Sequence, residues 1–187
     1  MTRVHLVRHG RAAAGWDTAV DPPLDAVGRS QAAAMASRLA PLGPLPLVSS
    51  PLLRCRQTAA ALEQVWGSSA RIEPAVAEIP SPAGVGMGGR VDWLRAAMAG
   101  TWTELGPRYT AYRDAVVAAV GALASETVVC SHFVAINAVV AAAEEKAVDR
   151  LGIASELTRR RADAEHAHPE AVAKSEDADR AMCSAAS

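Results

Sequence analysis

The chain has 187 residues and a mass of 19.4 kDa, enough for one α/β domain with a tail or an insert. Its 19 basic and 20 acidic residues leave a formal charge of −1, which argues against a general nucleic-acid or anionic-membrane binder but not against a local arginine cluster. Half of the residues are hydrophobic and only 4% are aromatic. We therefore expect a core of Val, Leu and Ala around one buried sheet.

The sequence carries no clear targeting or redox signal. No run approaches the roughly 18 consecutive apolar residues of a membrane span, and charge appears too early in the chain for a signal peptide. The three cysteines, Cys55, Cys130 and Cys183, are widely spaced and odd in number, so neither a disulfide framework nor a zinc site is indicated. We expect a cytoplasmic protein without a metal.

Short segments rich in Val and Leu alternate with longer Ala-rich segments, which is the pattern of a mainly parallel sheet. The short segments predict strands over residues 4–7, 45–48, 71–76 and 126–130. The longer segments predict helices over residues 25–39, 51–65, 91–98, 107–124 and 133–143. A Ser is expected to cap the second of these helices, and a loop rich in Pro and Gly is expected over 80–90. The fold class is therefore α/β, a single three-layer domain with helices on both faces of the sheet.

The composition changes after Ala143. Residues 144–157 fit an amphipathic helix, whereas residues 158–187 hold few large apolar side chains and many charged ones. We predict one domain over residues 1–143 and a divergent C-terminal tail over residues 144–187, helical in its first part and then mobile.

Polar clusters stand where three of the predicted strands end: Arg8-His9-Gly10, the segment 49–54, and Ser131-His132. In a parallel α/β sheet the carboxyl ends of the strands meet the helix N-termini at one edge, so reactive groups gather there. Glu78, just before the glycine-rich loop, is a fourth candidate. Two imidazoles, two guanidinium groups and a carboxylate in one crevice would suit phosphoryl transfer through histidine.

The chemistry of these side chains matches a phosphate monoester. Guanidinium forks bind phosphate oxygens in pairs and stay charged throughout. A neutral imidazole is nucleophilic near pH 7, and transfer to it requires mainly positioning and stabilisation of charge. The leaving alkoxide needs a proton, which a carboxylic acid with a raised pKa would supply.

Four ordered segments resemble the histidine phosphatase superfamily, also called the phosphoglycerate mutase-like family. LVRHGR at residues 6–11 resembles the family's RHG signature, and SSPLLRCRQTA at residues 49–59 resembles its second motif. The other two segments are PLD at residues 23–25 and VVCSH at residues 128–132. The resemblance covers about residues 3–142 and implies a phosphoglycerate mutase-like fold.

The resemblance also implies roles for single residues. His9 would be the nucleophile that forms a phosphohistidine. Arg8, Arg54 and His132 would line the phosphate pocket, with His132 steadying the transferring group. Glu78 falls where the family usually places its proton donor. Neither a metal nor an organic cofactor is implied.

Two positions depart from the family pattern. Phe133 stands where the family often has Gly, and its ring would either narrow the pocket or face the core. The glycine-tryptophan-glutamate-glycine run usually found downstream of Glu78 is absent. Specificity would lie in residues 80–106, where the pattern fails, so a sugar phosphate, a nucleotide-derived phosphate, a small phosphorylated acid and a phosphoprotein all stay open.

The leading hypothesis is a metal-independent phosphatase that hydrolyses a phosphate monoester. A phosphoglycerate mutase is the alternative enzyme, but the 54 positions from Glu78 to His132 leave little room for the longer cap segments of the mutases. A non-catalytic module that binds a phosphorylated ligand is the alternative from another class. We expect a small phosphorylated substrate and neither a nucleic-acid nor a membrane partner, and the oligomeric state stays open.

Overall fold

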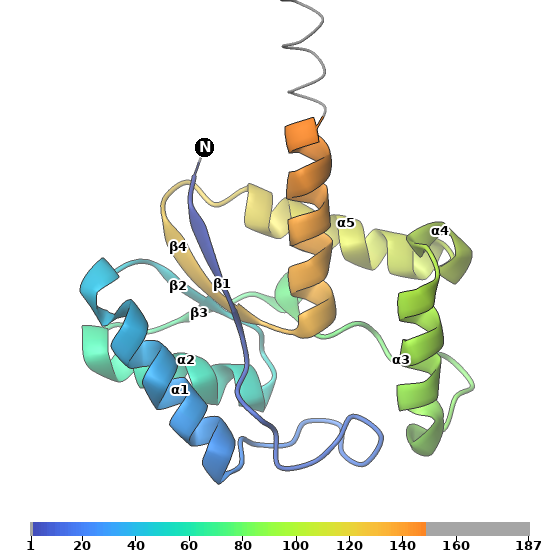
Figure 1. The fold of residues 1–187 in the computed structure, drawn as a ribbon, viewed down its shortest axis with the longest axis horizontal. Coiled ribbons are helices and arrows are strands. Elements are labelled where there is room, and N and C mark those ends of the chain that lie inside the picture. The colour runs from blue at the N-terminus through green and yellow to red at the C-terminus, as the bar shows by residue number, and fades with distance from the viewer. Residues whose placement is uncertain (1, 149–187) are drawn as a thin grey trace, which may run out of the picture. The chain divides into compact units, whose positions relative to one another are not determined.

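A computed structural model describes residues 2–148 of the chain (Figure 1). The chain divides into two units, Met1–Ala142 and Ala143–Ser187, and the sheet and the site belong to the first unit. Residues 144–148 are helical. The rest of the predicted tail, residues 149–187, lies outside the described residues.

Within the described residues, four parallel strands form one sheet in the order β1-β4-β2-β3. The strands are β1 Val4–Arg8, β2 Leu47–Ser49, β3 Arg71–Ile72 and β4 Thr127–Ser131. β4 pairs with β1 on one side and with β2 on the other, and all five of its residues are buried. The predicted parallel α/β sheet is confirmed.

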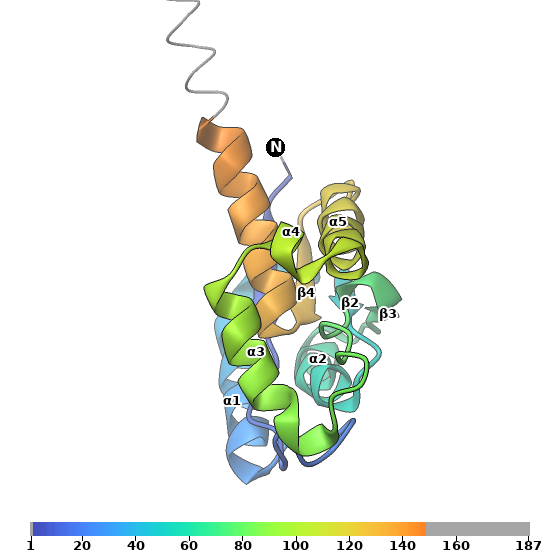
Figure 2. The same cartoon turned by 90° about the vertical axis from the view of Figure 1, so that its right-hand side faces the viewer.

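Helices cover both faces of this sheet. They are α1 Ala26–Leu39, α2 Leu53–Trp66, α3 Arg90–Ala99, α4 Trp102–Leu105, α5 Pro107–Gly121 and a last helix over residues 133–148. Figures 1 and 2 show α1 and α2 together on one side of the strands and α5 on the other. Among the described residues, no helix combines the length and the apolar character that a membrane crossing requires.

Alternate strand residues supply the two halves of the core, as the pleat of a sheet requires. Leu47, Val128 and Cys130 pack in one cluster with Ala36 of α1 and with residues of α2. On the opposite face, a second cluster brings together Val48 and Val129 of the strands, Val120 of α5 and Val139 of the last helix. The sheet is therefore the middle of three layers, as predicted.

Three elements differ from the prediction. α2 begins at Leu53, and its N-cap residue, Leu52, has no side chain that could accept a hydrogen bond. The Leu53 N–H donates instead to the Asp21 carboxylate, at 2.8 Å. The predicted Ser cap is therefore wrong. β3 ends at Ile72 because Pro74, which has no N–H for a ladder, starts a short 3₁₀ turn. The predicted strand 71–76 was too long. α4 was not predicted, although Thr101 and Glu104 form a capping box at its start.

Two glycines let the loop after β1 pass close to the start of α1. A Cβ on Gly10 would clash with the Gly28 backbone, and a Cβ on Gly28 would clash with the Arg11 backbone. The α1 N-terminus is capped by the Asp25 carboxylate, which accepts from the Gly28 N–H at 2.7 Å. Contact between the two backbones thus fixes the chain immediately after His9.

Substituting Gly28→Ala tests this contact. Alanine ordinarily stabilises a helix relative to glycine, but here we expect the free energy of unfolding to fall by about 1–3 kcal/mol, because the two backbones must separate. Gly121→Ala in α5 is the matched control, since a Cβ there meets nothing within 4 Å. Urea unfolding of both variants checks the prediction, and equal stability of the two would contradict it.

Candidate active site

The carboxyl ends of β1, β2 and β4 carry the predicted site residues to one edge of the sheet. Beyond the strands, the ladder continues: the His9 N–H donates to the Ser131 carbonyl at 3.1 Å, and the Ser50 N–H donates to the Cys130 carbonyl at 3.0 Å. His132 follows directly on β4. The same hydrogen-bond pattern that builds the sheet therefore places His9 beside His132, with ring centroids 5.2 Å apart.

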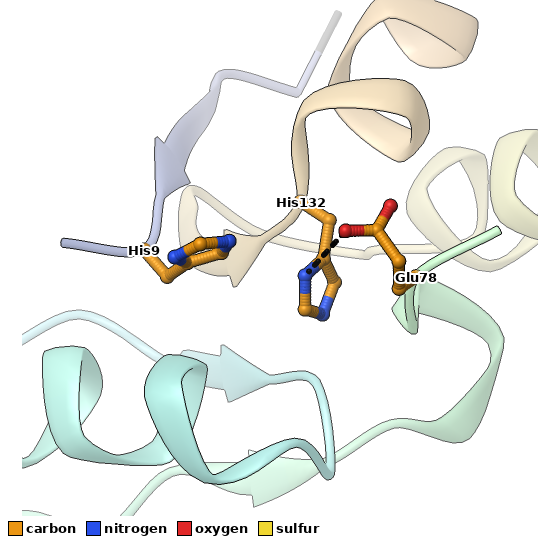
Figure 3. Close-up of side chains that lie close together, drawn as sticks. All are labelled: His9, Glu78 and His132. Carbon is orange, nitrogen blue, oxygen red and sulfur yellow. Dashed lines mark ion pairs between the residues drawn. The ribbon is translucent and has the colours of Figure 1, made fainter. Parts of the chain in front are cut away.

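Glu78 reaches the site from the segment that follows β3. Two side chains hold that segment: the Ser131 hydroxyl donates to the Val76 carbonyl at 2.7 Å, and the Tyr112 hydroxyl of α5 donates to the Ala77 carbonyl at 2.9 Å. Figure 3 shows His9, Glu78 and His132 converging from three separate parts of the chain. The structure brings these three predicted residues together.

Arg54 lies among these three side chains. It is the second residue of α2 and is only 5% exposed. Its Nε–H donates to His9 Nε2 at 3.2 Å, its second terminal nitrogen lies 3.2 Å from His132 Nδ1, and the same nitrogen donates to Glu78 Oε2 at 3.4 Å. A single buried guanidinium therefore contacts three of the other four predicted site side chains, all but Arg8.

The hydrogen bond to Gly10 sets the tautomer of His9. The carbonyl of Gly10 can only accept, so at 2.8 Å it is paired with a proton on His9 Nδ1. The lone pair of the neutral ring is then on Nε2, which faces Arg54. Burial lowers the pKa of His9 from 6.5 to about 4, so the ring is neutral and nucleophilic across the physiological range.

The pKa of Glu78 is lowered, whereas the sequence predicted a carboxylic acid with a raised pKa. Burial by itself raises the pKa of this carboxyl, but the hydrogen bond and charge of His132 and the charge of Arg54 together outweigh it. His132 Nδ1 lies 3.3 Å from Glu78 Oε2. In the protein without substrate, Glu78 is therefore ionised at neutral pH.

His132 is fully buried and contacts the site with both ring nitrogens. Nε2 lies 2.8 Å from the Ser50 hydroxyl, and Nδ1 faces both Arg54 and Glu78. Nδ1 carries either a proton or a lone pair, so it pairs with Glu78 or with Arg54 but not with both at once. The Cys55 thiol is 3.3 Å from Nε2, but burial raises its pKa well above the usual range, which leaves it unreactive.

His9, Glu78 and His132 each offer one possible metal-ligand atom, and these three atoms lie within 4.8 Å of one another. Two imidazoles and a carboxylate can bind a divalent cation. Each of these donor atoms, on His9, Glu78 and His132, already lies within 3.4 Å of a nitrogen of Arg54. A metal ion among them would therefore lie against a permanent positive charge. The arrangement suits an anion better, because an anion would gain from Arg54 instead of being repelled by it.

The site opens into a cavity of about 960 Å³. His9, Arg54 and Glu78 line it, and so do Arg8 and Phe133. The Arg8 guanidinium lies over the Phe133 ring, 5.3 Å from its centroid. Of the two places the sequence left open for Phe133, the structure has the ring at the cavity wall, where it is 43% exposed, and not in the core.

Sequence reasoning gave no role to Thr58 or Ser50, which support the site. The Thr58 hydroxyl accepts from the Gly10 N–H at 3.1 Å and donates to the Arg54 carbonyl at 2.8 Å, so it links the loop after β1 to α2. The Ser50 hydroxyl holds His132. Both are buried hydroxyl residues. Their position within segment 49–59, which resembles a family motif, is the sequence signal that would have identified them.

The comparisons with known proteins agree with this geometry. The family model of the histidine phosphatase superfamily (branch 1) matches residues 4–166, most of the chain. The chain belongs to that superfamily. A curated relative, the probable phosphoglycerate mutase GpmB of Escherichia fergusonii, is 35% identical over 83 residues, which are 42% of this chain. The match spans only about two fifths (39%) of that relative's length.

Solved structures of other proteins share the fold of this histidine phosphatase superfamily member. A mycobacterial glucosyl-3-phosphoglycerate phosphatase, solved in complex with VO3, is 26% identical, with a TM-score of 0.60 over 76% of this chain and 81% of that one. A phosphoglycerate mutase from Thermus thermophilus is 28% identical, with a TM-score of 0.55 over 72% of this chain and 80% of that one. The fold is phosphoglycerate mutase-like, as predicted.

Titration of His9 by NMR tests the tautomer and burial argument. We expect one imidazole to take up its proton only near pH 4, because burial disfavours the charged ring, so the ring stays neutral as the pH falls from 7 to 5. Carbon-bound proton shifts of the histidine rings would follow the titration, and His9→Gln would assign the signal. A midpoint for His9 near 6.5, the value of a solvated imidazole, would contradict the prediction.

Proposed function

We propose that this superfamily member is a phosphatase that hydrolyses a phosphate monoester through a phosphohistidine on His9. The observation that carries the proposal is the contact of the buried Arg54 guanidinium with His9, Glu78 and His132 at 3.2–3.4 Å. A fixed cation beside a neutral imidazole that has its lone pair on the nitrogen facing the cation is what transfer of a phosphoryl dianion requires, because the dianion binds the cation and frees that lone pair for attack. The proposed enzyme acts on a small phosphorylated substrate and needs neither a metal nor an organic cofactor. We place it in the cytoplasm.

In the first step, His9 Nε2 attacks phosphorus, the N–P bond forms and the bond to the ester oxygen breaks. The hydrogen bond from Nδ1–H to the Gly10 carbonyl holds the ring in line and stabilises the positive charge that develops on it. Arg54 and His132 bind the equatorial oxygens, and Arg8 binds the phosphate from the cavity rim. Glu78 gives its proton to the leaving oxygen.

Glu78 can donate only after it has taken up a proton, and substrate binding would supply the reason for uptake. The pKa of Glu78 is low in the free enzyme because His132 and Arg54 outweigh its burial. A bound phosphate dianion would take over both of these partners and add its own negative charge. Burial would then dominate, and the pKa of Glu78 would rise. The expected raised pKa thus becomes a property of the substrate complex.

In the second step, water attacks phosphorus opposite the N–P bond. Glu78, now a carboxylate, accepts a proton from the water, the N–P bond breaks and the electron pair returns to His9 Nε2. The products are inorganic phosphate, a neutral imidazole and a protonated Glu78. When the phosphate leaves, Glu78 regains its contacts with Arg54 and His132 and releases this proton to solvent, which returns the enzyme to its starting state without a further reactant.

A phosphoglycerate mutase is the second candidate, favoured by the 35% identical relative of that name. It would share the first step and then return the phosphoryl group to another hydroxyl. A phosphoglycerate also carries a carboxylate, which needs a cation of its own. Besides Arg54, the described cavity lining offers Arg8 and Arg11, and Arg11 is already paired with Asp25. Hydrolysis is therefore the better supported reaction.

Trapping the intermediate tests the phosphatase mechanism. We expect p-nitrophenyl phosphate to be hydrolysed with EDTA present, and quenching in base to reveal one added phosphoryl group on His9 by mass spectrometry. His9→Gln should lose both, because the attacking nitrogen is gone. His5→Gln is the control: His5 lies on β1, the strand that leads to His9, but it pairs with Glu126, at 2.8 Å, outside the cavity. Binding of vanadate without any phosphohistidine or turnover would favour the non-catalytic module.

Incubation with 3-phosphoglycerate and a bisphosphoglycerate primer separates the two enzyme candidates. For a phosphatase we expect inorganic phosphate to accumulate without 2-phosphoglycerate, because only water reaches the phosphohistidine. Phosphorus NMR of the mixture distinguishes the products. Isomerisation to 2-phosphoglycerate in excess of phosphate release would show the mutase reaction instead.

A further inference from the structure

A second cavity, of about 370 Å³, lies beside the first between α3 and the helix over residues 133–148. The two cavities share four apolar wall residues, Leu94, Met98, Phe133 and Val134. The second cavity therefore adjoins the first one along this shared wall. Together they form one continuous apolar surface that starts at the predicted phosphate site.

The charges are distributed unevenly along this surface. Among the residues that the structure describes, the lining of the second cavity includes no charged residue, and its polar members are Thr101 and Asn137. Of the cations of the first cavity, Arg54 contacts the histidines and Arg11 pairs with Asp25, whereas Arg8 lies over the Phe133 ring, where the two cavities meet. The apolar part beyond Phe133, in the second cavity, has no cation among its described lining residues. A second anionic group on a substrate would enter the apolar part without a partner, which is costly.

Two shared wall residues are large and apolar, yet accessible to solvent. Met98 is 53% exposed and Phe133 is 43% exposed. A ligand that covers them would remove apolar surface from water, which is favourable roughly in proportion to the area covered. Exposed apolar residues grouped along a cavity beside a polar pocket are typical of a ligand site.

We propose that the substrate is a monoester of an extended apolar alcohol, whose chain runs from the phosphate site over Phe133 and Met98 into the second cavity. This inference rests on the proposed phosphatase function and names its substrate class. Phosphoglycerates and sugar phosphates are poor substrates on this view, because their carboxylate or hydroxyl groups would lose water along the apolar wall without finding partners.

A series of n-alkyl phosphates from butyl to octyl phosphate, used below their micelle concentrations, tests the proposal. Lengthening the chain leaves the leaving-group chemistry unchanged, so any trend in kcat/KM reports binding of the chain. We expect kcat/KM to rise by about two- to fourfold per methylene until the second cavity is filled. We also expect octyl phosphate to exceed 3-phosphoglycerate in kcat/KM.

Two variants of α3 provide matched charges inside and outside the cavities. Met98→Glu places a carboxylate on the shared wall, and we expect it to flatten the chain-length series. Ala96→Glu adds the same charge to the same helix at an exposed position that lines neither cavity. It should leave the series as in the parent protein. Both side chains are exposed at their positions, so neither substitution opens a hole in the core.

The outcomes of these experiments distinguish failure of the apolar substrate class from failure of the proposed phosphatase function. A flat series with measurable turnover, or a 3-phosphoglycerate rate above that of octyl phosphate, would overturn the apolar substrate and leave the phosphatase standing. A rising series that Ala96→Glu flattens as much as Met98→Glu does would also overturn the cavity assignment. Failure of every monoester, p-nitrophenyl phosphate included, together with no phosphohistidine, would overturn both.

Discussion

The burial of one guanidinium governs the chemistry of this protein. Arg54 is held almost out of water on α2. Among residues 2–148, its side-chain partners are two imidazole nitrogens, Glu78 and the more distant Asp21 at 3.7 Å. A buried cation must be paired. The side chains around Arg54 therefore stabilise its charge, and its charge in turn limits which residues can stand beside it. It helps to keep the pKa of Glu78 low, and its positive charge favours an anion over a cation as a ligand at this site.

The supports of the candidate site come from distant parts of the chain, so the geometry of the site and the fold depend on the same contacts. Tyr112 on α5 holds the carbonyl before Glu78, and Thr58 on α2 joins the loop after His9 to the carbonyl of Arg54. On the other side, that loop lies against the backbone of α1 at Gly28. Loss of any one support shifts a reacting group by a fraction of an ångström, enough to affect a reaction that depends on position.

The parallel sheet and the positions of the two histidines could be predicted from the sequence. The features that could not be predicted depend on contacts between residues that are distant in the chain. Hydrophobic runs and polar strand ends located the parallel sheet, and the placement of His9 and His132 at its edge follows from strand pairing. The cap of α2 by Asp21 could not be predicted, because it joins residues 32 positions apart across a loop. The low pKa of Glu78 could not be predicted either, since it results from three-dimensional competition between burial and charge.

The cavity has a polar end and an apolar end, and the two differ in how freely their residues can be substituted. The end around Arg54 holds polar groups that are buried or half-buried and joined by hydrogen bonds, among them His9, Glu78 and His132. A substitution there would leave partners unsatisfied, so these residue types are tightly constrained. The far end is lined by partly exposed apolar side chains such as Met98 and Phe133, which accept exchange at little cost to stability. A change at Met98 or Phe133 would therefore alter which group the cavity accepts while leaving the hydrogen bonds around Arg54 in place.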